Sequence, residues 1–222
     1  MYCAIIGDIV DSKKIKNRKE IQTKLENVLL DINRNYEVDI AANFVITLGD
    51  EFQGLLKLPG NLTRVIELIK MELYPIKLRF GAGIGEIYTE INPIIAIGAD
   101  GPAYYNAREA IDIIKKESNM YEKPYQDVRY HLNSDKLTES NNLINALLSS
   151  CSLIESKWTI KQREVIKLAY IDSLSQKEIS AKLELKNSSI QRRIDSAGYY
   201  TFISALNAVD SFVSKLWEEY NG

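Results

Sequence analysis

Two segments decide the fold of this chain, Gly7-Asp8-Ile9-Val10 and Leu48-Gly49-Asp50-Glu51-Phe52. Each segment places an aspartate, Asp8 or Asp50, directly after an apolar, strand-like run. If the two runs pair in one sheet, both carboxylates lie close together at its edge. Magnesium prefers oxygen ligands, usually one or two carboxylates together with phosphate oxygens, so the pair predicts a metal-phosphate site. The alternative is that both aspartates are ordinary turn residues, because Gly-Asp is a common turn sequence.

The rest of the N-terminal half alternates between strand-like and helix-like patterns. Their order, β-α-β-β-α-β-α-β, favours an α/β sandwich with helices on one or both faces of a sheet. The predicted helices are residues 18–33, 61–73 and 102–116, and the predicted strands are residues 1–10, 44–48, 52–58, 76–89 and 128–132.

The composition of the 222 residues, 45% hydrophobic and 26% charged, is that of a globular protein with a real core. The formal net charge of −2 means that any nucleic-acid surface must be local. A single histidine excludes a multi-histidine metal centre. The sequence has neither a signal-peptide pattern nor about eighteen consecutive apolar residues. We therefore expect a cytoplasmic protein with no membrane partner.

The pattern changes after residue 132, where strand candidates end. We expect three parts, namely an α/β domain over residues 1–132, a connector with one helix over residues 133–157 and an all-α domain over residues 158–222. The last helix, residues 199–220, repeats apolar residues at 4-3-4-3 spacing. We expect it to cover the core of the all-α domain, with a dimer contact as the alternative.

Two short helices with a brief turn between them are predicted inside the all-α domain. Ser175-Gln176-Lys177-Glu178 is a capping box that begins the first helix, and Asn187 or Ser188 caps the second. Such a pair makes a helix-turn-helix, whose second helix reads DNA. The predicted DNA-binding residues are Lys186, Ser188, Ser189, Gln191, Arg192 and Arg193.

This stretch resembles region 4 of bacterial sigma factors and the LuxR-type regulators. The resemblance rests on Gln162-Arg163-Glu164-Val165 and on the later segment Leu174-Ser175-Gln176-Lys177-Glu178-Ile179. One position departs from that pattern, since Glu184 stands in the turn where those proteins often have glycine. The alternative is a small helical domain that packs on its neighbour and binds nothing.

The N-terminal half resembles class III nucleotidyl cyclases and, through Gly49-Asp50-Glu51-Phe52, diguanylate cyclases. The similarity extends to the glycine-rich segment 79–86 and to the block 98–110, where cyclases have their transition-state helix. The resemblance implies a ferredoxin-like βαββαβ sandwich. It also implies Mg²⁺ or Mn²⁺ bound by Asp8, by the carbonyl of Ile9 and by Asp50, with Arg108 as the catalytic cation.

A phosphorylated ligand has further candidate contacts around this predicted metal site. The start of the helix expected after Asp11-Ser12 can offer free N–H groups to anions, and an arginine can bind phosphate bidentately. The predicted ligand-binding residues are Asp11, Ser12, Arg18, Gly49 and Arg108.

The whole chain most closely resembles the SatD family. Its blocks Gly-Asp-Ile-Val-x-Ser and Asp-Gly-Pro-Ala-x-x-x-Ala-Arg-Glu-Ala are matched at residues 7–12 and 100–110. Two positions depart from the cyclases: Ile46 replaces the purine-selecting lysine, and Tyr104 replaces the transition-state asparagine.

We therefore expect a two-domain regulator rather than an enzyme. In this hypothesis its cyclase-like domain binds a nucleotide or another phosphorylated ligand through a metal, and its helix-turn-helix binds DNA. One alternative is an active metal-dependent nucleotidyl cyclase or nucleotidyltransferase. The other is a catalytically inactive platform for protein interactions. Because class III cyclases build their site across a dimer, the resemblance also suggests a homodimer.

Overall fold

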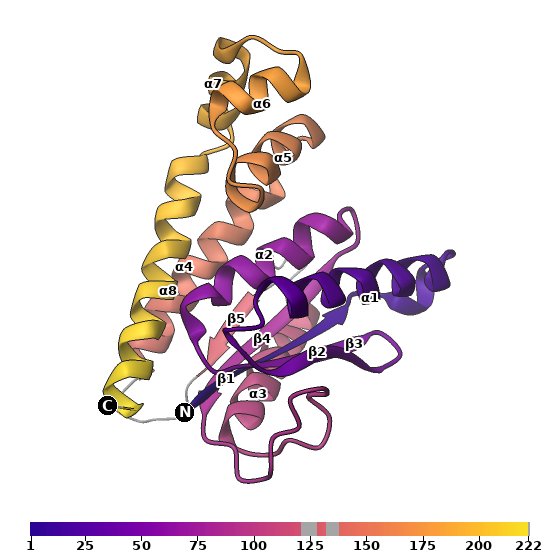
Figure 1. The fold of residues 1–222 in the computed structure, drawn as a ribbon, viewed down its shortest axis with the longest axis vertical. Coiled ribbons are helices and arrows are strands. Elements are labelled where there is room, and N and C mark those ends of the chain that lie inside the picture. The colour runs from indigo at the N-terminus through magenta and orange to yellow at the C-terminus, as the bar shows by residue number, and fades with distance from the viewer. Residues whose placement is uncertain (121–127, 132–137, 222) are drawn as a thin grey trace.

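The computed structural model describes residues 1–120, 128–131 and 138–221, and it has an α/β part followed by a helical part (Figure 1). One five-stranded sheet in the order β2-β3-β1-β4-β5 forms the centre of the α/β part. Strand β1 is antiparallel to β3 and β4, whereas β4 and β5 are parallel. The strands are β1 (Tyr2–Ile9), β2 (Ile40–Leu48), β3 (Glu51–Leu56), β4 (Leu78–Gly85) and β5 (Val128–His131).

Helices cover both faces of this sheet, as Figure 1 shows, with α1 and α2 on one face and α3 on the other. Alternation along β1 explains this, because Cys3 and Ile5 join the core under α1 and α2, whereas Ala4 and Ile6 join the core under α3. The sequence therefore predicts the α/β class correctly. The helices are α1 (Arg18–Asn35), α2 (Leu62–Leu73) and α3 (Pro102–Met120).

Glycines in β4 let α3 lie unusually close to the sheet. A Cβ atom on Gly81 would lie 2.1 Å from the Ala107 carbonyl oxygen, and one on Gly83 would lie 2.3 Å from the Ala107 amide nitrogen. Only a residue without a side chain fits such an approach. Strand β4 also ends at Gly85, so the prediction of a strand over residues 76–89 is too long at both ends.

The helical part begins with α4 (Thr138–Ser156) and ends with the long helix α8 (Tyr199–Asn221), which lie side by side in Figure 1. Three shorter helices follow α4 in the chain and precede α8, and they lie at the end of the molecule away from the sheet (Figure 1). The capping box predicted at Ser175 and Glu178 is present, and Thr159 and Gln162 form a second one. The shorter helices are α5 (Ile160–Ile166), continued by a π-helical turn (Lys167–Ile171), α6 (Gln176–Leu183) and α7 (Asn187–Ser196).

The sequence led us to expect that the last helix covers the core of the α5–α7 unit. In the structure it reaches that core only at its N-terminal end. That core consists of Val165, Leu168, Ile179, Ile190 and Ile194, and among the described hydrophobic residues of α8 it is Tyr199, at the start of the helix, that packs against it. The apolar seam of α8 joins the main core, which includes α2, α4, the sheet and a few side chains of the α5–α7 unit such as Ile166 and Ala197. The prediction therefore holds only for the start of α8, where Phe202 packs on Trp158. The seam residues are Phe202, Leu206, Val209, Val213 and Leu216.

Polar contacts also attach α8 to the α/β part. The backbone N–H of Thr63 donates to Asp210 at 3.0 Å, and its hydroxyl donates to the same carboxylate at 2.6 Å. Near the C-terminal end of α8, the Trp217 indole N–H donates to the Met1 carbonyl at 2.9 Å. Helix α8 therefore connects the α5–α7 unit to the sheet along most of its length.

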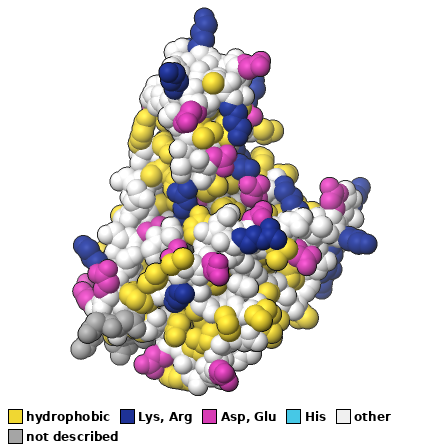
Figure 2. Space-filling model, viewed as in Figure 1, with side chains coloured by type: hydrophobic (Ala, Val, Ile, Leu, Met, Phe, Trp, Pro, Cys, Tyr) yellow, Lys and Arg dark blue, Asp and Glu magenta, His cyan; other side chains and the backbone are white. Residues whose placement is uncertain are grey.

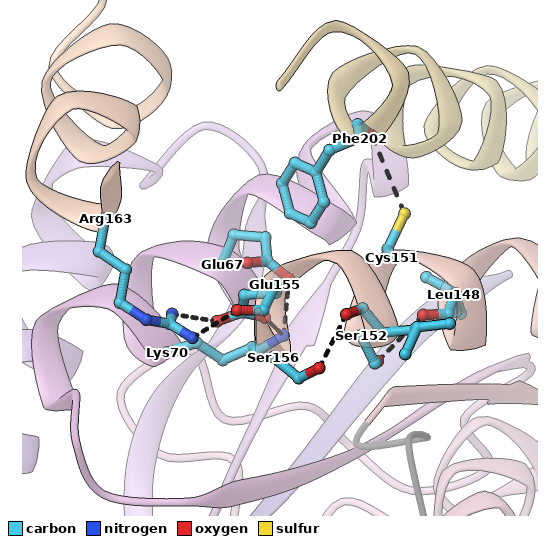
Figure 3. Close-up of polar contacts among 10 residues, drawn as sticks. Glu67, Lys70, Leu148, Cys151, Ser152, Glu155, Ser156, Arg163 and Phe202 are labelled. Carbon is cyan, nitrogen blue, oxygen red and sulfur yellow. Dashed lines mark hydrogen bonds and ion pairs between the residues drawn. The ribbon is translucent and has the colours of Figure 1, made fainter. Parts of the chain in front are cut away.

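Buried charges lie where α2, α4 and α5 meet (Figure 3). Glu155 of α4 accepts hydrogen bonds from Arg163 of α5 and pairs with Lys70 of α2, which also pairs with Glu67. These four side chains are 3% to 15% exposed. No helix in the described ranges combines the length and apolar character needed to cross a membrane.

Candidate functional site

The first candidate site is at the end of β1, where Asp8 is 6% exposed. Asp8 lies directly opposite Glu51 of β3 and opposite Arg79 of β4. Residues paired across antiparallel strands project on the same face, here the face covered by α3. Two carboxylates in direct register repel each other, so this arrangement depends on nearby cations.

Two cations pair with the Asp8 carboxylate. Arg79 donates from Nε to Oδ1 at 2.8 Å and from its terminal nitrogen to Oδ2 at 3.3 Å. Lys115 of α3 is 3.0 Å from the same Oδ2. Both carboxylate oxygens of Asp8 therefore already have positively charged partners.

Glu51 has a cation of its own. Arg108 of α3 donates to its two carboxylate oxygens at 2.6 and 2.7 Å, in the bidentate geometry that gives strong pairs. These hydrogen bonds hold the pKa of Glu51 below its ordinary value, although partial burial acts in the opposite direction. Asp112, one helical turn further along α3, also acts on the Arg108 charge. The predicted catalytic cation is thus engaged with a carboxylate.

The turn between β2 and β3 brings the other predicted residues to the same end of the sheet, beside the end of β1. The Ile9 amide donates to the Asp50 carbonyl at 3.2 Å, which places the two predicted metal-binding positions next to each other. Gly49 has a φ of +67°, which suits glycine. A Cβ on Gly49 would lie 3.0 Å from a terminal nitrogen of Arg18 in α1, so Arg18 lies beside the turn.

Asp11 and Ser12 lie just beyond β1, in a short turn rather than at the start of a long helix. Ser12–Lys14 is a single 3₁₀ turn, and α1 begins only at Arg18. The Asp11 carboxylate pairs with Lys14 at 3.2 Å, and the Ser12 residue is buried. This turn is too short to provide the aligned N–H groups of a helix terminus.

The implied Mg²⁺ or Mn²⁺ does not fit at Asp8 in this arrangement. A cation there would have to displace both Arg79 and Lys115, and a buried carboxylate gives up such partners at considerable cost. Asp50 and the Ile9 carbonyl remain as oxygen donors. Within the described ranges, no group of three or more His, Cys, Asp or Glu side chains is arranged for a metal. The metal stays a prediction.

Glu51, Arg79 and Lys115 were missed as site residues by the sequence analysis. Glu51 belonged to the motif, but its role depends on strand register, which places it opposite Asp8. Lys115 lies seven residues after Arg108 on α3, and that spacing of two helical turns was a usable signal. The structure also describes the two positions that depart from the cyclases. Ile46 packs against the main core, and Tyr104, on α3 itself, is buried in the core between α3 and the sheet.

The second candidate site is the surface formed by α6 and α7. The two helices pack together through Ile179 and Ile190, with a three-residue connection over 184–186. Of the predicted DNA-binding residues, three are exposed and three are half-buried. The exposed ones are Lys186, Ser188 and Arg192, and the half-buried ones are Ser189, Gln191 and Arg193.

Gln191 fixes the two helices in register rather than projecting freely. Its amide oxygen accepts a hydrogen bond from Gln176 at 2.7 Å, and its amide nitrogen donates to Asp195 at 2.7 Å. Contrary to the predicted cap at Asn187 or Ser188, α7 begins at Asn187 with Lys186 as the N-cap residue and no side-chain cap.

The connection between the two helices uses a left-handed residue. Glu184 has a φ of 53° and ends α6. This is the position where the resembling regulators often have glycine, and the left-handed conformation explains that preference, because it costs an ordinary side chain about 1 kcal/mol.

Comparisons with known proteins give one family. The model of the SatD family matches residues 2–212, which include both candidate sites. A comparison with curated protein sequences finds no significant match.

Proposed function

This chain belongs to the SatD family, and we propose that its α6–α7 unit is a helix-turn-helix that binds DNA. The observation that carries this proposal is the packing of two short helices across a three-residue connection, with the first residues of the second helix exposed. A recognition helix contacts base edges with its N-terminal residues. Here those residues follow Lys186, whose charge suits a phosphate.

The charges around α6 and α7 are consistent with this proposal. Residues 175–197 contain five Lys or Arg against three Asp or Glu, so this segment is more basic than the whole chain. Figure 2 shows basic side chains at the end of the molecule where these helices lie, with acidic ones between them. A modest local excess suits a binding mode in which few phosphates are contacted, and it predicts a shallow salt dependence.

The test compares Arg192→Gln with Arg34→Gln, because both arginines are exposed helical residues and only Arg192 is on α7. Fluorescence anisotropy with a labelled DNA duplex would be measured over a series of salt concentrations. Loss of one phosphate contact should lower the slope of log affinity against log salt by about one. Arg34→Gln should behave as the wild type. Absence of any salt-sensitive binding by the wild-type chain would refute DNA binding.

A second function, binding of a nucleotide or another phosphorylated ligand at the end of β1, is favoured by the sheet topology. In the strand order β2-β3-β1-β4, β3 lies between β2 and β1, and β1 lies between β3 and β4. All of these neighbouring strands are antiparallel. This strand order is the one expected of a ferredoxin-like βαββαβ sandwich, and it supports the proposal of a cyclase-like domain. It also explains why Asp8 adjoins the Gly49-Asp50 turn.

A phosphate at this edge would compete with the carboxylates for Arg79, Arg108 and Lys115. Thermal unfolding would be followed with ATP, GTP and pyrophosphate, each with Mg²⁺ and with EDTA. A ligand present at about 100 times its dissociation constant stabilises the folded state by about 2.7 kcal/mol. Arg108→Gln should abolish this shift and Arg34→Gln should retain it.

The same unfolding experiment also distinguishes the enzyme hypothesis from the hypothesis of a platform for protein contacts. A shift that requires Mg²⁺ would favour the metal-dependent hypothesis, and conversion of labelled ATP or GTP to a cyclic product would establish the enzyme. Unchanged unfolding with all three compounds would contradict a phosphate site and leave the α/β part as a platform for protein contacts.

A further inference from the structure

The connection between β4 and α3, residues 86–101, is a long loop that forms neither helix nor strand. Loops of more than about 12–15 residues without secondary structure are uncommon in compact domains, and they are usually functional. In Figure 1 this loop lies at the end of the molecule opposite the α5–α7 unit.

Hydrogen bonds and burial hold the loop against the sheet. The Asn43 N–H of β2 donates to the Pro93 carbonyl at 3.0 Å, and the Gln53 side chain of β3 donates to the Ala96 carbonyl at 2.7 Å. Ala96 is fully buried in the core between α3 and the sheet. A loop held in this way has little conformational freedom left to lose when a partner binds.

Apolar side chains of this fixed segment nevertheless project into solvent. The two tyrosines flank Asp100, which accepts a hydrogen bond from the Tyr105 hydroxyl at 2.7 Å and another, at its carbonyl, from the Tyr88 N–H at 2.8 Å. Figure 2 shows hydrophobic side chains at this end of the molecule, with acidic ones beside them. Exposed apolar patches with a polar rim mark interaction sites. The five side chains, each 39% to 71% exposed, define the loop surface: Tyr88, Ile94, Ile95, Ile97 and Tyr105.

The charges of this segment all have one sign. Glu86, Glu90 and Asp100 are exposed, and the sequence has no Lys or Arg between Arg79 and Arg108. These carboxylates would repel a nucleic acid or an anionic membrane. A two-fold contact between two copies would place the same carboxylates against each other, which disfavours self-association through this surface. Charge complementarity therefore points to a basic partner with an apolar surface of its own.

The neighbouring edge of the sheet does not favour an extended partner segment. Strand β2 is an edge strand, but the Asn43 N–H is already bonded to Pro93, and the N–H and carbonyl of Phe44 are bonded to the Asn33 side chain. An added strand needs these backbone groups free, whereas a docked helix is recognised through side chains.

We propose that the loop surface docks an amphipathic helix of a partner protein, with an apolar face flanked by Lys or Arg. The isoleucines and tyrosines contact the apolar face of that helix, and the three carboxylates of the loop attract its basic side chains. This surface is separate from the end of β1 and from α6 and α7, so the proposal does not depend on the functions proposed above.

The test follows the fluorescence anisotropy of a labelled amphipathic helical peptide, made of leucine and lysine, during titration with the full chain. We expect saturable binding with a dissociation constant below about 0.1 mM. A peptide in which glutamate replaces lysine should bind at least tenfold more weakly, because like charges then face each other.

Substitution of both Ile94→Ser and Ile97→Ser should weaken binding of the leucine–lysine peptide about tenfold or more, because burial of an isoleucine side chain is a large favourable term. Both positions are exposed, so the double variant should fold as the wild type does. The matched control is Ile160→Ser on α5, where the isoleucine is 73% exposed and lies outside the loop surface. Its binding should equal that of the wild type.

Four results of the titration would overturn the proposal: no binding of the leucine–lysine peptide, equal binding of the glutamate peptide, unchanged binding by the double variant, or equal weakening by Ile160→Ser. Sedimentation velocity tests the remaining occupant, a second copy of the chain. A wild-type dimer that the double variant converts to a monomer would assign the loop surface to self-association and also overturn the proposal.

Discussion

Glu155→Gln should destabilise the protein strongly, because Glu155 compensates two buried cations. Arg163 donates to its carboxylate at 2.7 Å and to its backbone carbonyl at 2.8 Å, and Lys70 pairs with its other oxygen. The side chains of Lys70 and Arg163 are 7% and 15% exposed. After the substitution, Lys70 would keep its ion pair with Glu67 at 3.1 Å, and Arg163 would keep its hydrogen bond to the backbone carbonyl of residue 155, but the carboxylate between the two cations would be gone (Figure 3).

The expected loss follows from the cost of leaving a buried charge without its partner, about 3–5 kcal/mol. This is a large fraction of the 5–15 kcal/mol that stabilises a typical domain. Urea unfolding at neutral pH measures it: with a slope of about 2–3 kcal/mol per molar, the midpoint should fall by at least 1 M or so. The matched control is Glu164→Gln on α5, which is exposed and should change stability by less than about 0.5 kcal/mol.

The pH dependence provides a second measurement of the same interaction. Burial alone would raise the pKa of Glu155, but Lys70 and Arg163 outweigh it and hold the pKa below its ordinary value. A depressed carboxyl pKa contributes stability that is fully present above the unfolded value and is lost as pH falls through the folded value. The Glu155→Gln variant should therefore lose less stability than the wild type on acidification. If Glu155→Gln lowers the free energy of unfolding at neutral pH by less than about 1 kcal/mol, the reasoning is wrong.

Two further substitutions test other parts of the fold. Burial raises the pKa of Asp210 from 3.8 to about 6, against the hydrogen bonds from Thr63. The folded state then binds this proton more tightly than the unfolded state, so its contribution to stability rises by about 3 kcal/mol as pH falls from about 7.5 towards 4. Asp210→Asn should remove that part of the dependence, and urea midpoints at several pH values would show it; an unchanged profile would contradict it. Glu184→Gly should raise the free energy of unfolding by up to about 1 kcal/mol, because glycine adopts the left-handed φ of 53° without strain; urea unfolding measures it, and a decrease would show that the lost side chain matters more than the backbone.

Local sequence signals predicted the elements of this fold better than their packing. The α/β class, the Ser175 capping box and the boundaries near Arg18 and Leu73 all follow from periodicity and caps, which are local properties. The packing partners of α8 do not follow from periodicity. A 4-3-4-3 seam indicates only that one face of the helix is apolar, and not which elements cover it. The strand predicted over 76–89 was too long for a similar reason, since β4 ends at Gly85, which pairs with Tyr2 at the start of β1.

The candidate site at the end of β1 could likewise be predicted only in part. The sequence motifs brought Asp8, Ile9, Gly49 and Asp50 to attention, and the structure has them at one edge of the sheet. The ion pairs of Asp8 with Arg79 and of Glu51 with Arg108 depend on strand register and on the position of α3. Neither can be derived from the motif, yet they determine which groups a ligand must displace. Roles for these residues remain predictions.

Helix α2 determines how the proposed DNA-binding unit is oriented relative to the sheet. Arg64 donates to the Tyr36 hydroxyl at the end of α1 and, on the other side, to the Ile171 carbonyl at 2.9 Å and the Ser173 hydroxyl at 3.0 Å. Lys167 pairs with Glu72 at 2.6 Å. These contacts fix the segment immediately before α6. Coupling between two sites requires differential contacts in two states. A change in the orientation of the whole α5–α7 unit relative to α2 would therefore break the Arg64 and Lys167 contacts, and a ligand of the α/β part that produced such a change would have to compensate for their loss.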